Sequence, residues 1–229
     1  MKFLARINSI IFTVALCLCA AALTSCSAKT AEMQKAFESF KGNYIVFVSK
    51  KNFMLEVYDR KMIKVAVFRI AYGLNPDGGQ KMHAGDNRTP EGTYRITEIL
   101  SMDADKKSSA YSKLRDMNST YFKAADGHSK YGHPDVDLGY NAYGPRFFRL
   151  NYPVKEDVER YNRAVKNGII KPINGKIPGI GSGIAIHGNA DEASIGHLSS
   201  SGCIRLYNTD LVKLDQFIII GTPVLISAD

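Results

Sequence analysis

One histidine and one cysteine near the C-terminus are the residues best suited to chemistry. His187 ends the short apolar run 184–186, and Cys203 follows it sixteen positions later. A thiol attacks a carbonyl carbon only as the thiolate, so Cys203 needs a group that takes its proton. Imidazole is the usual group, acting as a general base or as the cation of a thiolate–imidazolium pair. His187 and His197 are the two candidates for that group.

The neighbours of this pair have types that suit acyl transfer. Gly188 lets the backbone turn away directly after His187, which suits a side chain that projects into a cleft. Ser201 and Gly202 are small and leave room for a substrate, and their N–H groups could bind an oxyanion. Arg205 could bind a substrate carboxylate through two parallel hydrogen bonds.

The first 25 residues are predicted to be a lipoprotein signal peptide. Lys2 and Arg6 precede an apolar run over residues 7–23, which is the layout of an export signal rather than of a structural helix. The run ends in Leu-Thr-Ser-Cys, which resembles the bacterial lipobox with Cys26 as the lipidated residue. The alternatives are an ordinary signal peptide cut near Ala22 and an uncleaved anchor. We therefore expect an exported protein, lipid-anchored to a bacterial membrane and facing the periplasm or cell wall.

The four cysteines of the chain leave one thiol without a partner. Cys17 and Cys19 lie in the leader, Cys26 is the predicted lipidation site, and Cys203 remains. Structural cysteines in an oxidising compartment are normally paired. Cys203 is therefore either a buried small hydrophobic residue or a reactive group.

Composition places the remaining chain in the class of globular domains. The 229 residues are 45% hydrophobic and carry a formal net charge of +8, which allows one packed domain plus a leader. A modest positive charge is typical of a solvated surface, with an anionic wall polymer or lipid headgroups as the alternative partner. Export argues against nucleic acid as a partner.

The predicted elements describe a mainly β protein with a few helices. Residues 26–42 are expected to form a tether or a short helix, followed by a domain over 43–229. Strands are predicted over Tyr44–Ser49, Phe53–Asp59, Met62–Ile70, Thr93–Leu100, Phe147–Leu150 and Phe217–Ile226. Helices are predicted over Ser108–Asn118, Glu156–Asn167 and Asn208–Gln216.

The stretch from Leu100 to Gly183 is long for a loop region, so we expect a lid or a groove wall there. Residues 128–145 within it are rich in Gly, Tyr and His and predict an irregular surface excursion. His83, His128 and His133 lack the spacing of metal ligands and are interpreted as solvated loop residues. No metal and no cofactor are expected.

The central motif resembles the L,D-transpeptidase catalytic domain, the YkuD family. The residues that resemble it are Ile-His-Gly, a spacer with Ser-Ile-Gly, and Ser-Gly-Cys-Ile-Arg-Leu-x-Asn-x-Asp, over about residues 183–224. The segment Thr89–Ile96, which begins Thr-Pro-Glu-Gly, is similar to one that precedes the active site in that family. The resemblance implies a β-sandwich-like fold and a monomer that acts on peptidoglycan.

Roles for single residues follow from this resemblance. Cys203 matches the acylated nucleophile and His187 its base. Three further positions match groups that orient the imidazole, form the oxyanion hole and face the substrate: Gly188, the segment Ser201–Gly202, and Arg205. The implied reaction attacks a tetrapeptide stem, releases its terminal D-alanine and leaves a thioester, which an amine of another stem resolves.

One residue departs from the pattern of the family. Many members have His directly before Gly-Cys, where this chain has Ser201. His197 lies outside the matched positions and is interpreted as a surface residue. Two alternatives remain open: a hydrolase on the same scaffold, acting as an L,D-carboxypeptidase or releasing wall-bound protein, and an inactive wall-binding lipoprotein.

Overall fold

The computed structural model describes residues 29–75 and 79–229. The chain divides into two units, Met1–Lys41 and Gly42–Asp229. In the first unit residues 29–38 are helical. The predicted signal peptide and Cys26 lie outside the described residues. Within the described ranges, no helix combines the length and the apolar character needed to cross a membrane.

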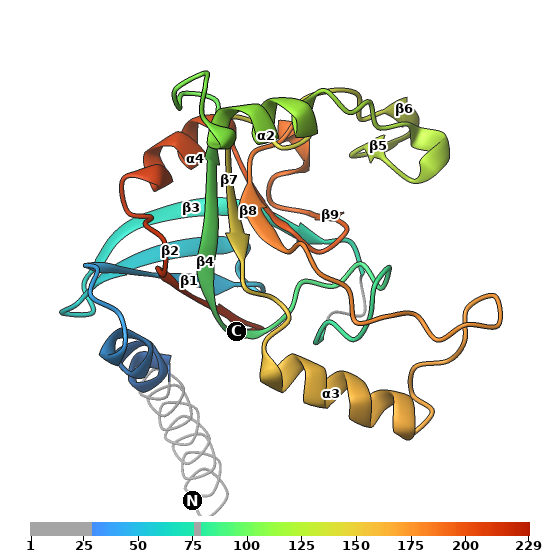
Figure 1. The fold of residues 1–229 in the computed structure, drawn as a ribbon, viewed down its shortest axis with the longest axis horizontal. Coiled ribbons are helices and arrows are strands. Elements are labelled where there is room, and N and C mark those ends of the chain that lie inside the picture. Colours follow the sequence, from blue (N-terminus) through green and yellow to red (C-terminus); the bar gives the residue numbers. More distant parts are fainter. Residues whose placement is uncertain (1–28, 76–78) are drawn as a thin grey trace, which may run out of the picture. The chain divides into compact units, whose positions relative to one another are not determined.

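The second unit is organised by one sheet that closes on itself (Figure 1). In the described residues this sheet has nine strands in the order β10-β8-β7-β4-β11-β1-β2-β3-β9. Because β10 also pairs with β3, the strands between them form a closed, barrel-like sheet with β9 attached at one side. The strands are β1 Tyr44–Ser49, β2 Met54–Asp59, β3 Lys64–Gly73, β4 Gly92–Ser101, β7 Arg146–Leu150, β8 Ala185–His187, β9 Leu198–Ser200, β10 Ile204–Leu206 and β11 Pro223–Ser227.

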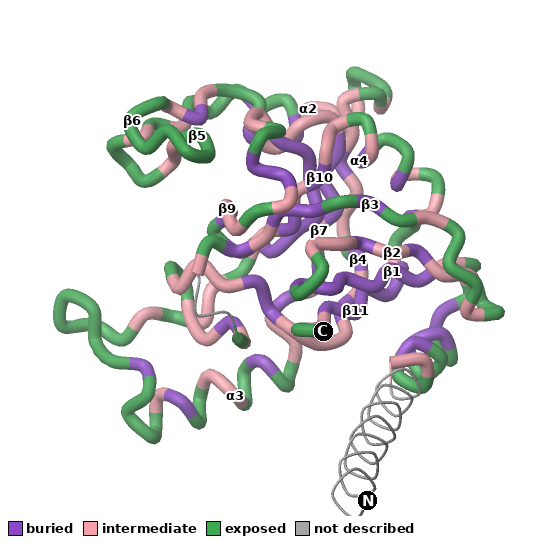
Figure 2. The backbone as a smooth tube through the Cα atoms, turned by 180° about the vertical axis from the view of Figure 1, so that it is seen from behind, coloured by how far each residue is buried: buried purple, intermediate pink, exposed green. Residues whose placement is uncertain are grey.

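The core of this unit lies inside the closed sheet. The parallel strands β1 and β11 are neighbours in the sheet around this core, and both are buried along almost their whole length (Figure 2). Aliphatic and aromatic side chains from the strands around the barrel fill the interior, including Val46, Leu55, Ile70, Ile96, Phe148, Ile186 and Ile204. Burial of such side chains is the main source of the stability of the unit.

Three helices of the second unit confirm the predicted positions within one residue at each end. They are α2 Ser109–Asn118, α3 Lys155–Lys166 and α4 Asn208–Asp215. The hydroxyl of Ser108 accepts a hydrogen bond from the N–H of Tyr111 and so caps α2. Helix α2 packs on β4, where Leu114 joins a second buried cluster with Leu100, Phe147 and Ala185.

The excursion between α2 and β7 has a small sheet of its own. The turn η1 Ala124–Asp126 is followed by β5 Ser129–Lys130 and β6 His133–Asp137, which pair antiparallel and form what we call the hairpin. The hairpin projects beside the closed sheet (Figure 1) and is largely exposed (Figure 2).

The predicted strand over Phe217–Ile226 is wrong in its first half. Only Pro223–Ser227 forms β11, and residues 217–222 turn instead. Gly221 has a φ of +88°, and the hydroxyl of Thr222 accepts a hydrogen bond from the N–H of Ile219. Ile219 and Ile220 are consequently more than half exposed, so the apolar sequence there reflects a turn and not a strand.

Candidate active site

Strand alternation separates the core residues of β8 and β10 from those of the site. The two strands are parallel neighbours, with Ile204 opposite Ile186 and Arg205 opposite His187. Ile186 and Ile204 belong to the barrel core. Successive side chains of a strand point to opposite faces, so His187 and Arg205 lie on the outer face.

His187 and Cys203 line one cavity on this outer face. The cavity has a volume of about 180 Å³, and we call it the thiol cavity. Its wall also includes Ser201 and Arg205 from the central motif, and residues of the excursion: Phe122, His128, Leu138, Ala142 and Tyr143. The predicted groove wall within Leu100–Gly183 is thus formed, at this cavity, by residues 122–143.

The ring of His187 is fixed by one hydrogen bond and two aromatic neighbours. Its Nδ1 lies 2.6 Å from the carbonyl oxygen of Gly188. A carbonyl oxygen only accepts, so Nδ1 carries the proton and the neutral ring leaves Nε2 as the basic nitrogen. Phe147 stacks on the ring at a centroid distance of 5.9 Å, and Tyr143 lies at 5.2 Å.

Burial keeps the imidazole of His187 neutral. His187 is 3% exposed. Burial, with the charge of Arg205, lowers its pKa to about 3, although the hydrogen bond to Gly188 acts in the opposite direction. A neutral imidazole can accept a proton from the thiol during attack, which is the requirement for a general base.

The thiol of Cys203 is held between backbone groups at the start of β10. Its Sγ lies 3.6 Å from the carbonyl oxygen of Gly183, to which the thiol donates. Burial raises the pKa of Cys203, whereas a hydrogen bond from the backbone of Ala185 and the charge of Arg205 lower it less strongly. The resting pair is therefore a neutral thiol and a neutral imidazole, which favours general-base transfer over a preformed ion pair.

The segment before Cys203 is fixed by two buried hydroxyl groups. The hydroxyl of Ser200 accepts from the N–H of Gly202 at 3.1 Å and donates to the carbonyl of Cys203 at 2.5 Å. The hydroxyl of Thr89 donates to the carbonyl of Gly202 at 2.8 Å. The N–H of Gly202 is thus occupied by Ser200, and the N–H groups of Ser201 and Cys203 are left as oxyanion candidates.

Two glycines of the site are required by their surroundings. Gly202 has a φ of +132°, and a Cβ there would lie 2.8 Å from the carbonyl oxygen of Arg88. At Gly188 a Cβ would lie 2.2 Å from the side-chain oxygen of Asn208. That Asn208 oxygen accepts the N–H of Asn189 at 3.0 Å, so it holds the turn that follows His187.

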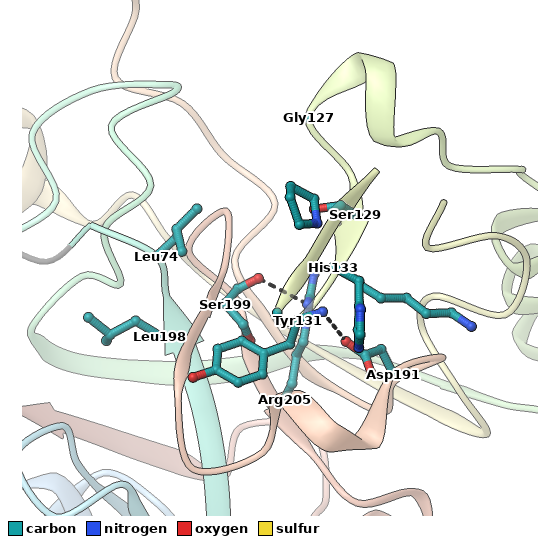
Figure 3. Close-up of a pocket in the computed structure, with 12 residues that line it drawn as sticks. Leu74, Gly127, Ser129, Tyr131, His133, Asp191, Leu198, Ser199 and Arg205 are labelled. Carbon is teal, nitrogen blue, oxygen red and sulfur yellow. Dashed lines mark hydrogen bonds between the residues drawn. The ribbon is translucent and has the colours of Figure 1, made fainter. Parts of the chain in front are cut away.

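Arg205 lines both the thiol cavity and a second cavity of about 320 Å³, which Figure 3 shows. Its Nη1 donates to the carbonyl of Ser199 at 3.1 Å, and its Nε is buried without a hydrogen-bond partner. Burial lowers the pKa of Arg205 from its ordinary value, but a guanidinium stays charged near neutral pH. Arg205 can therefore offer an unused donor to a ligand.

The hairpin forms the other side of the second cavity (Figure 3). The N–H of Tyr131 donates to the carboxylate of Asp191 at 2.6 Å, and the ring of Tyr131 stacks on His197 at 4.3 Å. His197 is thus an exposed residue that packs on the hairpin and does not line the thiol cavity. His133 is exposed and lines the second cavity.

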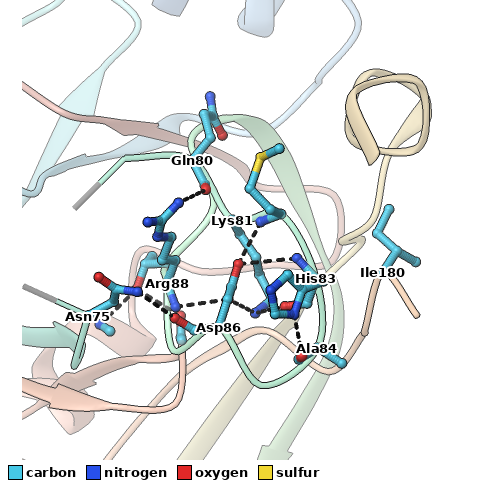
Figure 4. Close-up of polar contacts among 12 residues, drawn as sticks. Asn75, Gln80, Lys81, His83, Ala84, Asp86, Arg88 and Ile180 are labelled. Atoms are coloured by element: carbon cyan, nitrogen blue, oxygen red, sulfur yellow. Dashed lines mark hydrogen bonds and ion pairs between the residues drawn. The ribbon is translucent and has the colours of Figure 1, made fainter. Parts of the chain in front are cut away.

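A buried polar network supports the loop that precedes Thr89 (Figure 4). The ammonium of Lys81 lies 2.7 Å from the carboxylate of Asp86, which also accepts the N–H groups of Met82, His83 and Arg88. Burial acts to raise the pKa of Asp86, but these hydrogen bonds and the charge of Lys81 outweigh it and lower the pKa. The network fixes the backbone against which Gly202 packs.

His128 is the site residue that the sequence interpretation missed. It is not a solvated loop residue, because it is partly buried and lines the thiol cavity with Phe122 and Tyr143. The chain spacing between residues 128 and 187 gives no sign of this proximity. The only available signal was the density of aromatic residues and histidines in the excursion.

An imidazole at the end of β8 and a thiol directly before the neighbouring strand β10 line one cavity. These are the components of a thiol-dependent acyl-transfer domain. The chain belongs to the L,D-transpeptidase catalytic domain family, YkuD, which matches residues 43–226. The expected mainly β fold of that family is confirmed. The sheet is closed and barrel-like, because β10 pairs with both β8 and β3.

Individual relatives match different shares of the chain. The putative L,D-transpeptidase YqjB of Bacillus subtilis is 50% identical over 44 residues, which are 19% of this chain and 25% of the relative. Bd1075 of Bdellovibrio bacteriovorus is 23% identical with a TM-score of 0.46, and covers 82% of this chain. The helical cell shape determining protein Pgp2 of Campylobacter jejuni is 24% identical with a TM-score of 0.49, again over 82%. This chain spans 48% of each of these two solved chains.

Proposed function

We propose that this protein is a cysteine-dependent L,D-transpeptidase that acts on the tetrapeptide stems of peptidoglycan. The observation that carries the proposal is the position of two residues in the wall of one cavity: His187 at the end of β8, and Cys203 directly before the neighbouring strand β10. Membership in the L,D-transpeptidase catalytic domain family supports the substrate class.

The mechanism begins with a neutral pair. Nε2 of His187 takes the proton of Cys203 as the sulfur attacks the carbonyl carbon before the terminal D-alanine. Gly188 holds Nδ1–H and so keeps Nε2 directed for this transfer. The N–H groups of Ser201 and Cys203 stabilise the oxyanion, and Arg205 binds a carboxylate of the stem. D-alanine leaves, and an amine from another stem converts the thioester into an amide.

The first test is covalent capture of a tetrapeptide donor. Incubation with the purified stem should add the mass of the acyl group to the protein and release D-alanine. Cys203→Ala should abolish the adduct, and His187→Gln should slow its formation by roughly 10²–10⁴-fold, the usual contribution of general-base catalysis. An adduct that persists in Cys203→Ala would disprove the assignment of the nucleophile.

The products identify what resolves the thioester. Cross-linked dimers from muropeptides indicate a transpeptidase, whereas tripeptides without dimers indicate the hydrolase alternative. If both products and the adduct on Cys203 are absent, the result indicates the inactive wall-binding alternative.

We also propose that Cys26 carries a lipid that holds the domain outside the cytoplasm. The support is the sequence of the first 26 residues, with its basic start, apolar run and Leu-Thr-Ser-Cys end. A domain that modifies peptidoglycan needs to be exported. Expression with labelled palmitate should label the wild-type protein, and Cys26→Ala should remove the label and release the protein from the membrane fraction.

A further inference from the structure

The thiol cavity contains a second imidazole besides that of His187. His128 lines this cavity together with Cys203 and Ser201. It comes from the excursion, whereas His187 and Cys203 come from the closed sheet. The proposed mechanism gives His128 no task, although imidazole is the side chain best suited to move protons near neutral pH.

The backbone and the neighbouring rings fix the position of His128. Its N–H donates to the carbonyl of Lys123 at 3.1 Å, and its carbonyl accepts the N–H of Leu138 at 2.9 Å. Its ring meets the edge of Phe122 at a centroid distance of 4.9 Å. Phe122 contacts Tyr143, and Tyr143 contacts His187. An aromatic wall thus connects the two imidazoles around one cavity.

Besides the proton of the thiol, the proposed reaction has to move a proton at each of two nitrogen atoms, that of the leaving group and that of the incoming amine. An amide leaving group departs as an amine and needs a proton on its nitrogen. The incoming amine has to lose a proton when it forms the new amide. His187 is buried and its protonated form is disfavoured there, which makes it a poor store for a proton. His128 is partly exposed and can exchange protons with water.

We propose that His128 is a second acid–base residue of this site, an inference that rests on the proposed function. In acylation the C–S bond forms, the thiol proton moves to His187, the C–N bond breaks, and the departing nitrogen takes a proton from His128; His187 then passes its proton to His128 across the cavity. Aminolysis runs these transfers in reverse: His128 returns that proton to His187, the new C–N bond forms as the amine gives a proton to His128, the C–S bond breaks, and sulfur takes its proton from His187. Both imidazoles return to their starting states.

Two donors with different leaving groups test this assignment. The first is the tetrapeptide, and the second is the same acyl group as a thiophenyl ester, whose thiolate leaves without a proton. His128→Gln should slow acylation by the tetrapeptide by about 100-fold, within the usual range for general-acid catalysis. Acylation of the same variant by the thiophenyl ester should stay within about twofold of wild type.

His133→Gln is the matched control, because His133 lies in the same excursion as His128, on the hairpin, but outside the thiol cavity. It should acylate with both donors as wild type does. Ser201 lines the same cavity as His128, so adding Ser201→His to His128→Gln should restore at least about tenfold of the lost tetrapeptide rate. A purely structural role for His128 would not be rescued in this way.

Equal losses with both donors would assign His128 a structural role and overturn the inference. Wild-type rates in His128→Gln with the tetrapeptide would overturn it as well, leaving His187 to carry every proton. Failure of the proposed function is distinguishable, because the wild-type protein would then form no adduct on Cys203 with the tetrapeptide.

Discussion

At the scale of single residues, Arg205 acts on both members of the candidate pair, His187 and Cys203. Its charge lowers the pKa of Cys203 and also that of His187. It therefore favours the thiolate while it disfavours the imidazolium. Burial acts on the same two groups more strongly, and it opposes charge on each. The result is a site whose free form is uncharged at the pair and becomes charged only during reaction.

The first prediction concerns the reactivity of the thiol without substrate. Because burial raises the pKa of Cys203, alkylation by iodoacetamide at pH 7.5 should be slower than that of an ordinary exposed thiol. The rate should rise by about tenfold per pH unit toward alkaline pH, in proportion to the thiolate. In Arg205→Met the curve should move to higher pH. A rate that reaches its plateau below pH 8 would indicate a preformed ion pair instead.

The second prediction links His187 to the pH dependence of stability. Its pKa is lowered to about 3 in the folded protein, so below pH 6.5 the unfolded chain binds the proton more readily. The free energy of unfolding should therefore fall as the pH falls from about 6.5 to 3, by roughly 1 kcal/mol per pH unit from this residue. In His187→Gln this contribution should be absent. Urea unfolding of both proteins between pH 7 and 4 measures it, and parallel curves would refute it.

At the scale of elements, Thr89 joins the end of β3 to the segment that carries the thiol. Its hydroxyl accepts the N–H of Gly73 at 2.9 Å and donates to the carbonyl of Gly202 at 2.8 Å. Thr89 is 1% exposed. It begins the Thr-Pro-Glu-Gly segment, whose glutamate pairs with the buried Lys50 at 2.5 Å. The segment thus supports the backbone of Gly202 and does not line the thiol cavity.

The third prediction tests this support with a pair of variants. Thr89→Val keeps the volume but leaves the buried N–H of Gly73 without its acceptor, which should lower the free energy of unfolding by about 1–3 kcal/mol. It should also slow acylation of Cys203, because Gly202 loses its partner. Thr89→Ser retains the hydroxyl and should remain near wild type in acylation. A larger loss of acylation rate in Thr89→Ser than in Thr89→Val would contradict this and assign the role to the methyl group.

The elements differ in how far the sequence predicted them. The helix over 156–167 has strong helical periodicity, and the strand over 44–49 is a run of β-branched and aromatic residues followed by a turn. Both were found within one residue. The motif around Cys203 is local, so its pattern was visible in the chain. The position of His128 depends on how a long excursion folds over β7 and β8, and no spacing encodes that. The closure of the sheet through β10 and β3 is likewise a tertiary property.

At the scale of the whole molecule, the second unit has its own core and contains the whole candidate site. Residues Gly42–Asp229 form one unit with its own core, and the family match covers residues 43–226 within it. Both residues of the pair and every residue that lines the thiol cavity belong to that unit.

The fourth prediction follows from this independence. A protein of residues 42–229 should fold in one cooperative transition and form the acyl adduct at the rate of a protein of residues 27–229, within about twofold. Circular dichroism during thermal unfolding and intact-mass kinetics measure the two properties. Loss of cooperativity or of acylation in the shorter protein would show that residues 27–41 belong to the catalytic unit.

The closure of the sheet also determines when the site can form during folding. β10 is bounded by β3 on one side and β8 on the other, and β3 is separated from it by more than half of the chain. Contacts between such distant segments form late, because a large loop must close first. A chain in which β3 has not yet paired with β10 therefore leaves the neighbourhood of Cys203 incomplete. Under the proposed export, this occurs in a compartment that oxidises thiols. The ability of Cys203 to form the acyl adduct would then indicate that the chain has completed its folding. Rapid pairing of β10 with β3 would protect the thiol from irreversible oxidation.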